Sequence, residues 1–177
     1  KKNKNIIVIH HRKNLGLSSV FISSLKRATK KNFMIINSDY SWPKSSIYRM
    51  LSLMGRTDFI IGYRTNILSN ANFFRFINNL GLKLILKFLL FLPFKDAHGL
   101  FIAKLSDIKK IKFLNKVKNY KMGFTIFILT KLLKMKKNYI EVKTDVFDNS
   151  VNNSSVGNFK NTIYLLYFIV KLKLRLI

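Results

Sequence analysis

Three short apolar segments, separated by stretches with helical spacing, constrain the fold of this chain more than any other feature. The apolar segments are Ile6–Ile9, Phe33–Ile36 and Asp58–Gly62. Leu15–Thr29 carries apolar residues on one helical face, and Pro43 is suited to the first turn of a second helix. Buried strands that alternate with helices predict an α/β fold with a mostly parallel sheet, right-handed crossovers and flanking helices.

The second half of the chain continues with helices and strands in a less regular order. We expect helices over residues 70–92, Asp107–Ile111, Gly123–Met135 and Asn161–Ile177, and strands over Leu100–Ala103 and Tyr139–Val146. The helix over residues 70–92 is very apolar and either packs on the sheet or lies in a membrane interface with its lysines reaching the water. The C-terminal helix is either interfacial or the start of a membrane span.

The charge of the chain allows two explanations. There are 33 basic and 7 acidic residues, which gives a formal net charge of +26. One explanation is a polyanionic partner, either nucleic acid or an anionic membrane. The other is an AT-rich genome, whose codons favour Lys, Asn, Ile and Phe. The absence of Cys excludes disulfides and thiolate metal sites, and three scattered His residues are too few for a zinc site.

A carboxylate follows the second apolar segment directly. Asp39 comes three residues after Ile36, and Asn37 lies between them. Ligands of open α/β sheets bind beyond the carboxyl ends of strands, where a carboxylate can hold a divalent cation and the cation a phosphate. The alternative role for Asp39 is a turn residue before the helix at Pro43.

Six short motifs occur in an order and spacing that resemble those of a known family. They are Asn14-Leu15-Gly16, Asn37-Ser38-Asp39 with Pro43, Asp58–Arg64, Leu92–Gly99, Gly123-Phe124 and Ile140–Val142. Together they resemble the family 2 glycosyltransferases, which have the Rossmann-like GT-A fold of nucleotide-diphospho-sugar transferases. Within that family, the likeness is to polyprenyl-phosphate sugar transferases such as dolichol-phosphate mannosyltransferase.

The resemblance implies an inverting enzyme that moves a sugar from a nucleotide-sugar donor to a polyprenyl (dolichyl or undecaprenyl) phosphate or a related membrane-linked acceptor, as in cell envelope biosynthesis. It implies a divalent cation, Mg²⁺ or Mn²⁺, held by Asp39 and Asn37. It also implies that Asp96 acts as the catalytic base or positions the acceptor. Asn14, Gly16, Arg64 and Arg75 would bind the donor or a phosphate.

The resemblance also implies a location and a domain division. We expect an enzyme on the cytoplasmic face of a membrane, peripheral or membrane-anchored, in contact with anionic lipid. Residues 1–157 would form a GT-A catalytic domain that is incomplete at its N-terminus, and residues 158–177 an apolar and basic C-terminal helix.

Two alternatives remain open. Asn37 occupies the position of the first Asp of the family's Asp-x-Asp, which lowers the expected metal affinity and leaves an inactive or truncated glycosyltransferase as an option. The other alternative is a basic RNA-binding protein of ribosomal type, which is supported by charge alone. The ordered motifs favour the enzyme over nucleic-acid binding.

Overall fold

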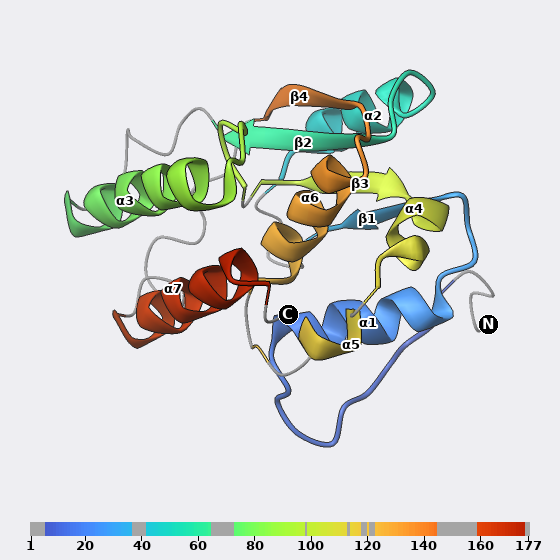
Figure 1. The fold of residues 1–177 in the computed structure, drawn as a ribbon. Coiled ribbons are helices and arrows are strands. Elements are labelled where there is room, and N and C mark those ends of the chain that lie inside the picture. Colours follow the sequence, from blue (N-terminus) through green and yellow to red (C-terminus); the bar gives the residue numbers. More distant parts are fainter. Residues whose placement is uncertain are drawn as a thin grey trace.

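A computed structural model shows an α/β fold in which helices flank a four-stranded mixed sheet (Figure 1). The structure describes residues 6–36, 42–64, 73–97, 99–112, 114–117, 120, 123–144 and 159–175. In chain order the elements are α1 (Leu17–Arg27), β1 (Asn32–Ile35), α2 (Lys44–Leu53), β2 (Phe59–Arg64), α3 (Phe73–Leu90), β3 (Phe101–Lys104), α4 (Leu105–Lys110), α5 (Leu114–Val117), α6 (Phe124–Lys134), β4 (Tyr139–Thr144) and α7 (Phe159–Lys173).

The prediction of a mostly parallel sheet is wrong, because the sheet is mixed. The strand order is β1-β3-β2-β4, with β3 antiparallel to both β1 and β2 and β4 parallel to β2. The physical reason lies in the connection before β3. The chain leaves the sheet at Arg64, forms α3 and returns at Asp96, which contacts Arg64. Strand β3 therefore starts at the edge where β2 ends and must run in the opposite direction.

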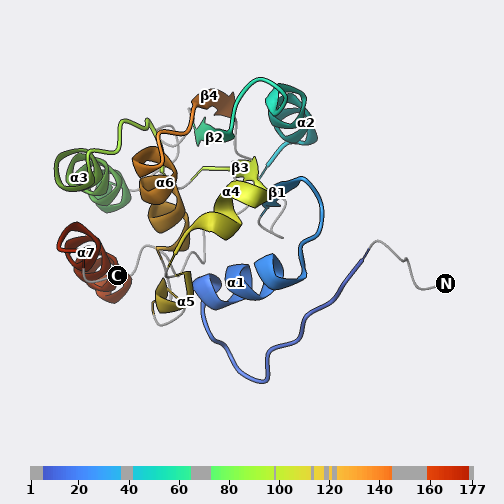
Figure 2. The same ribbon diagram turned by 45° about the vertical axis from the view of Figure 1, so that its right-hand side comes forward.

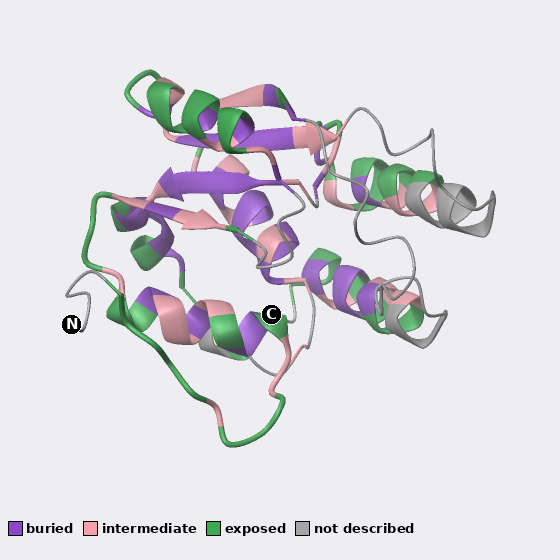
Figure 3. Cartoon of the chain, turned by 180° about the vertical axis from the view of Figure 1, so that it is seen from behind, coloured by how far each residue is buried: buried purple, intermediate pink, exposed green. Residues whose placement is uncertain are grey.

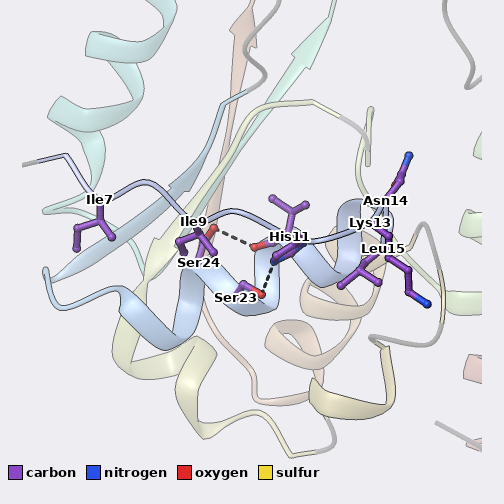
Figure 4. A pocket seen from close by; sticks show the side chains of 9 residues that line it. Ile7, Ile9, His11, Lys13, Asn14, Leu15, Ser23 and Ser24 are labelled. Carbon is purple, nitrogen blue, oxygen red and sulfur yellow. Dashed lines mark hydrogen bonds between the residues drawn. The ribbon is translucent and has the colours of Figure 1, made fainter.

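The prediction of a buried strand at Ile6–Ile9 is also wrong. These residues form no strand and are exposed, with Val8 at 68% of its full accessibility. Figure 4 shows that the segment instead runs along α1. A run of β-branched residues favours an extended conformation, but burial requires a pairing neighbour. Among the described residues, no strand pairs with this segment.

Helices cover both faces of the sheet (Figure 2). Strand β2 is buried from Phe59 to Gly62, so its alternate side chains enter two separate cores. On one face, Ile60 packs with Met50 of α2. On the other face, Phe59 and Ile61 belong to a larger cluster with residues of α1, α4 and α6. The buried residues in Figure 3 follow this layered arrangement.

Helices α3 and α7 lie side by side at the end of the molecule toward which β2 points (Figures 1 and 3). Helix α7 is anchored by Phe168, whose ring lies against Gly123 at the start of α6. In the described part of the chain, none of the helices combines the length and the hydropathy that crossing a bilayer demands.

Candidate functional site

The sheet brings the ends of three strands to one edge. Ile35 of β1 and Ile61 of β2 are both partners of Phe101 in β3, which lies between them. Strands β1 and β2 therefore run in the same direction and end at the same edge, two strand spacings or about 10 Å apart. Strand β4 pairs with β2 in parallel and ends there too, with Thr144 opposite Arg64.

Two of the predicted site residues form an ion pair at this edge. Arg64 Nε donates to Asp96 Oδ2 at 2.6 Å, and Arg64 Nη2 donates to Asp96 Oδ1 at 3.1 Å. The main-chain N–H of Arg64 also donates to Oδ2, at 3.4 Å. The Asp96 side chain is 9% exposed and that of Arg64 is 24% exposed. A bidentate guanidinium–carboxylate pair fixes the orientation of both groups.

The loop that carries Asp96 is held against β2 by a close backbone contact. Gly62 N–H donates to the carbonyl of Leu100 at 2.7 Å. A Cβ atom on Gly99 would lie 1.6 Å from the carbonyl oxygen of Gly62, so only glycine fits at position 99. This contact sets the distance between Arg64 and the loop.

Further polar side chains lie at this edge of the sheet. They were not predicted as site residues from the sequence. The main-chain N–H of Lys95 donates to Glu141 Oε1 at 2.7 Å, and Thr144 Oγ1 donates to the carbonyl of Tyr63 at 3.1 Å. The Lys95 ammonium lies 4.6 Å from the centre of the Tyr63 ring. Lys95 and Tyr63 are each adjacent in sequence to a predicted site residue, which is the signal that could have identified them.

The predicted donor-binding residues Asn14 and Gly16 lie elsewhere, at the start of α1. Gly16 N–H donates to Asn14 Oδ1 at 2.9 Å, and Gly16 has a φ of 80° as the N-cap of the helix. Asn14 therefore shapes the turn that begins α1. Helix α1 begins on the side of the molecule toward which β1 and β2 point (Figures 1 and 3).

A groove of about 370 Å³ lies between the extended N-terminal segment and α1 (Figure 4). Asn14 lines it together with Ile7, Ile9 and Ser23, and His11 Nε2 lies 3.0 Å from Ser23 Oγ. None of the residues that line this groove belongs to the edge that holds Arg64 and Asp96. The groove is thus separate from the ion pair.

Three predicted site residues cannot be placed. Asn37 and Asp39 lie outside the described residues, and β1 ends at Ile35, just before them. The backbone of Arg75 lies in α3, but its side chain is outside the description. Their roles stay predictions.

The sequence profile of glycosyl transferase family 2 matches residues 1–134, which is most of the 177-residue chain. The chain belongs to glycosyl transferase family 2. The matched region contains β1, β2, the Arg64–Asp96 pair and Gly99. A search of curated proteins returned no match to the chain.

Membership of family 2 confirms the resemblance at the level of the family and its activity class. The chain is a glycosyltransferase domain, and the family implies a nucleotide-sugar donor. The mixed sheet with flanking helices is consistent with the GT-A fold. The family typically uses a divalent cation. Among the described residues, no three or more His, Cys, Asp or Glu side chains lie close enough together to hold one.

Proposed function

We propose that this family 2 glycosyltransferase moves a sugar from a nucleotide-sugar donor to a polyprenyl phosphate in a membrane, with inversion at the sugar carbon. The observation that carries the proposal is the position of the Arg64–Asp96 pair at the base of the apolar helix α3. The chain departs from the sheet at Arg64 and returns at Asp96, which are 32 residues apart in the sequence. A lipid held along α3 would have its phosphate near this pair.

The chemistry of the pair suits a phosphate acceptor. A phosphate oxygen is already ionised, so it attacks the sugar carbon with little need for a base, and the bond to the leaving nucleotide diphosphate breaks with its electron pair. Arg64 supplies a guanidinium group, which binds phosphate well. Because Nε and Nη2 already donate to Asp96, a phosphate would be bound by the remaining N–H groups of the guanidinium. Asp96 then serves to orient Arg64 and the acceptor. A carboxylate in hydrogen-bond reach of the attacking oxygen is also the arrangement for general-base catalysis of a hydroxyl acceptor.

The sequence is the only support for a metal ion in this proposal, because Asp39 and Asn37 lie outside the described residues. A cation held by Asp39 and Asn37 would offset the charge of the leaving diphosphate. We assign the donor contacts to Asn14 and Gly16 and a phosphate contact to Arg75 on the strength of the resemblance. The same resemblance supports a catalytic domain over residues 1–157 and a location on the cytoplasmic face of a membrane.

The test is transfer of labelled sugar from UDP- and GDP-sugars to a polyprenyl phosphate in detergent, with Mn²⁺ or Mg²⁺ present. The proposal expects labelled lipid, and no product when the acceptor is a free sugar. Transfer to the free sugar instead of the lipid would overturn the assignment of the acceptor. Tight, salt-sensitive RNA binding without any transfer would favour the nucleic-acid alternative.

Variants at the strand end test the metal ligands. Asp39→Ala is expected to abolish the metal dependence of donor binding, and unchanged transfer would refute the role of Asp39. Asn37→Asp is expected to tighten Mn²⁺ binding, because a second carboxylate adds charge to the site. A wild-type protein without transfer that gains it on Asn37→Asp would show that the natural sequence is a degenerate copy.

A further inference from the structure

Helices α3 and α7 each leave a stripe of large apolar side chains exposed. On α3 the stripe has helical spacing and consists of Leu80, Leu84 and Phe88. The exposed Phe91 follows directly after the helix, in a left-handed backbone conformation with a φ of 53°. On α7 the corresponding stripe consists of Ile163, Tyr167 and Val170, and the exposed Leu174 follows directly after the helix. Phe88 and Phe91 are 68% and 74% exposed, which is unusual for such large apolar side chains.

The two stripes point away from the body of the protein. Helix α7 buries the opposite side of its cylinder, which carries Phe168 and Ile169, and α3 buries Leu86. Figure 2 views the two helices nearly end-on, side by side, with α6 and the sheet to one side of both. Because both helices bury the side that faces the body, their exposed stripes form one outer surface, here called the α3/α7 surface.

Basic residues accompany the apolar stripes, and acidic residues do not. The sequence of α3 includes Lys83 and Lys87, that of α7 includes Lys171 and Lys173, and neither helix contains Asp or Glu. The Lys173 ammonium lies 4.3 Å from the centre of the Phe91 ring, and that of Lys171 lies 4.6 Å from the centre of the Tyr167 ring. Aromatic rings with ammonium groups beside them are suited to the boundary between acyl chains and head groups.

We propose that the α3/α7 surface lies flat on an anionic lipid bilayer, with Phe88, Phe91 and Tyr167 in the interface and the lysines against phosphate head groups. This inference rests on the proposed function, since a membrane acceptor gives the surface its purpose. We choose anionic lipid as the partner because of the charge of the two helices. A surface with basic and no acidic residues is complementary to anionic lipid. It would repel a second copy of the same helices.

The proposal has two structural consequences. Helix α7 lies on the surface of the bilayer over Phe159–Lys173 instead of crossing it, which decides between the two roles that its sequence allows. Helix α3 ends at Leu90, six residues before Asp96, so the Arg64–Asp96 pair faces the level of the head groups. The acceptor phosphate then reaches the pair without leaving the membrane.

The experiment measures partition of the purified protein onto vesicles of phosphatidylcholine with and without 30% phosphatidylglycerol. The expected result is strong binding to the anionic vesicles and weak binding to the neutral ones. Phe88→Ser with Phe91→Ser is expected to lower the partition constant by about tenfold or more for each ring removed from the interface. Lys83→Glu with Lys87→Glu is expected to lower it by about fivefold per lysine on anionic vesicles.

Matched controls lie on α2 and α1. Tyr48 is 67% exposed, close to the 68% of Phe88, but belongs to α2, so Tyr48→Ser should leave the partition constant within about twofold of the wild-type value. Lys26→Glu on α1 is the control for charge. A tryptophan placed by Phe88→Trp should shift its fluorescence to the blue on anionic vesicles, whereas one placed by Tyr48→Trp should not. This second readout does not depend on removing an apolar side chain.

Equal partition of the Phe88/Phe91 double variant and the wild type would overturn the inference, as would equal blue shifts of both tryptophans. So would a concentration-dependent dimer in solution that shields a tryptophan at position 88, because a second copy would then cover the surface. The proposed function is tested separately, by transfer to acceptor in detergent. Transfer without vesicle binding refutes the membrane surface alone, and vesicle binding without transfer refutes the catalytic proposal alone.

Discussion

An ion pair between an aspartate and a basic residue lies at each end of strand β2, and the two pairs join different parts of the chain. At the start of the strand, Asp58 Oδ1 accepts from Lys104 Nζ at 2.6 Å, and Asp58 Oδ2 accepts from the main-chain N–H of Asn138 at 3.1 Å. Lys104 ends β3 and Asn138 precedes β4, so Asp58 joins three strands. The hydrogen bond with Lys104, and that with Asn138, hold the pKa of Asp58 below its usual value despite partial burial.

At the other end, Arg64 pairs with Asp96 in a loop outside the sheet. The strands joined by Asp58 already pair through their backbones, so its ion pair adds stability to an arrangement that exists without it. The Arg64–Asp96 pair fixes a loop at the edge where three strands end. An ion pair is thus a candidate for function when it positions a segment at an open edge of the sheet, and a structural contact when it joins strands that are already paired.

The largest expected effect comes from neutralising the two aspartates in turn. Asp96→Asn is expected to lower kcat/KM for transfer to polyprenyl phosphate by about 10² to 10³-fold, because Arg64 and the acceptor lose their fixed orientation. Asp58→Asn is expected to leave kcat/KM within about threefold of the wild-type value. Steady-state kinetics on both folded variants measure the two changes in kcat/KM. Equal losses in the two variants would break the comparison between the ends of the strand.

The next effect concerns the close contact between Gly99 and the carbonyl oxygen of Gly62. Gly99→Ala places a methyl group against the Gly62 carbonyl and is expected to reduce the free energy of unfolding by about 3 kcal/mol, since backbone must move. Gly81→Ala in α3 is the matched control, because a Cβ there meets nothing within 4 Å. It is expected to stabilise the helix by up to about 1 kcal/mol. Urea denaturation measures both, and an unaffected Gly99→Ala protein would contradict the contact.

A smaller effect is the pH dependence of the stability that the Asp58–Lys104 pair contributes. Since the pKa of Asp58 is lower in the folded than in the unfolded state, its contribution is complete at neutral pH and is lost as pH falls through the folded value. Asp58→Asn is expected to cost about 1 kcal/mol at pH 7, because the pair is partly exposed. The difference between the two proteins should shrink below about pH 4. A difference that does not shrink at all as pH falls below about 4 would show that the charge is not its source.

The smallest effect concerns Glu141, which accepts from the main-chain N–H of Lys95. Glu141→Gln keeps an oxygen acceptor and loses the charge, so we expect a loss of about 0.5 kcal/mol in stability and a two- to threefold decrease in transfer. Kinetics and denaturation on the same preparation measure the two. A decrease as large as that of Asp96→Asn would extend the functional end of the strand to β4.

Most of the local structure could be predicted from the sequence. The helix over Gly123–Met135 and the strand over Phe33–Ile36 appear within one residue of their predicted limits, and a helix follows Pro43 as predicted. The short helix α5 was not predicted, because four residues carry no periodic signal. Arg64 and Asp96 were predicted as separate site residues from their motifs. Their pairing was not predicted, because the segment between them, which separates the two residues by 32 positions, does not specify where the chain returns to the sheet after α3.

The sequence by itself determined most of the elements, the family and the order of its motifs, because periodicity, proline positions and motif spacing act over a few residues. Only the tertiary structure decided the direction of β3, the exposure of Ile6–Ile9 and the contact between Gly99 and Gly62. The physical reason is that strand pairing depends on which edge the returning chain meets. The packing of whole elements sets that edge, and no local pattern records it.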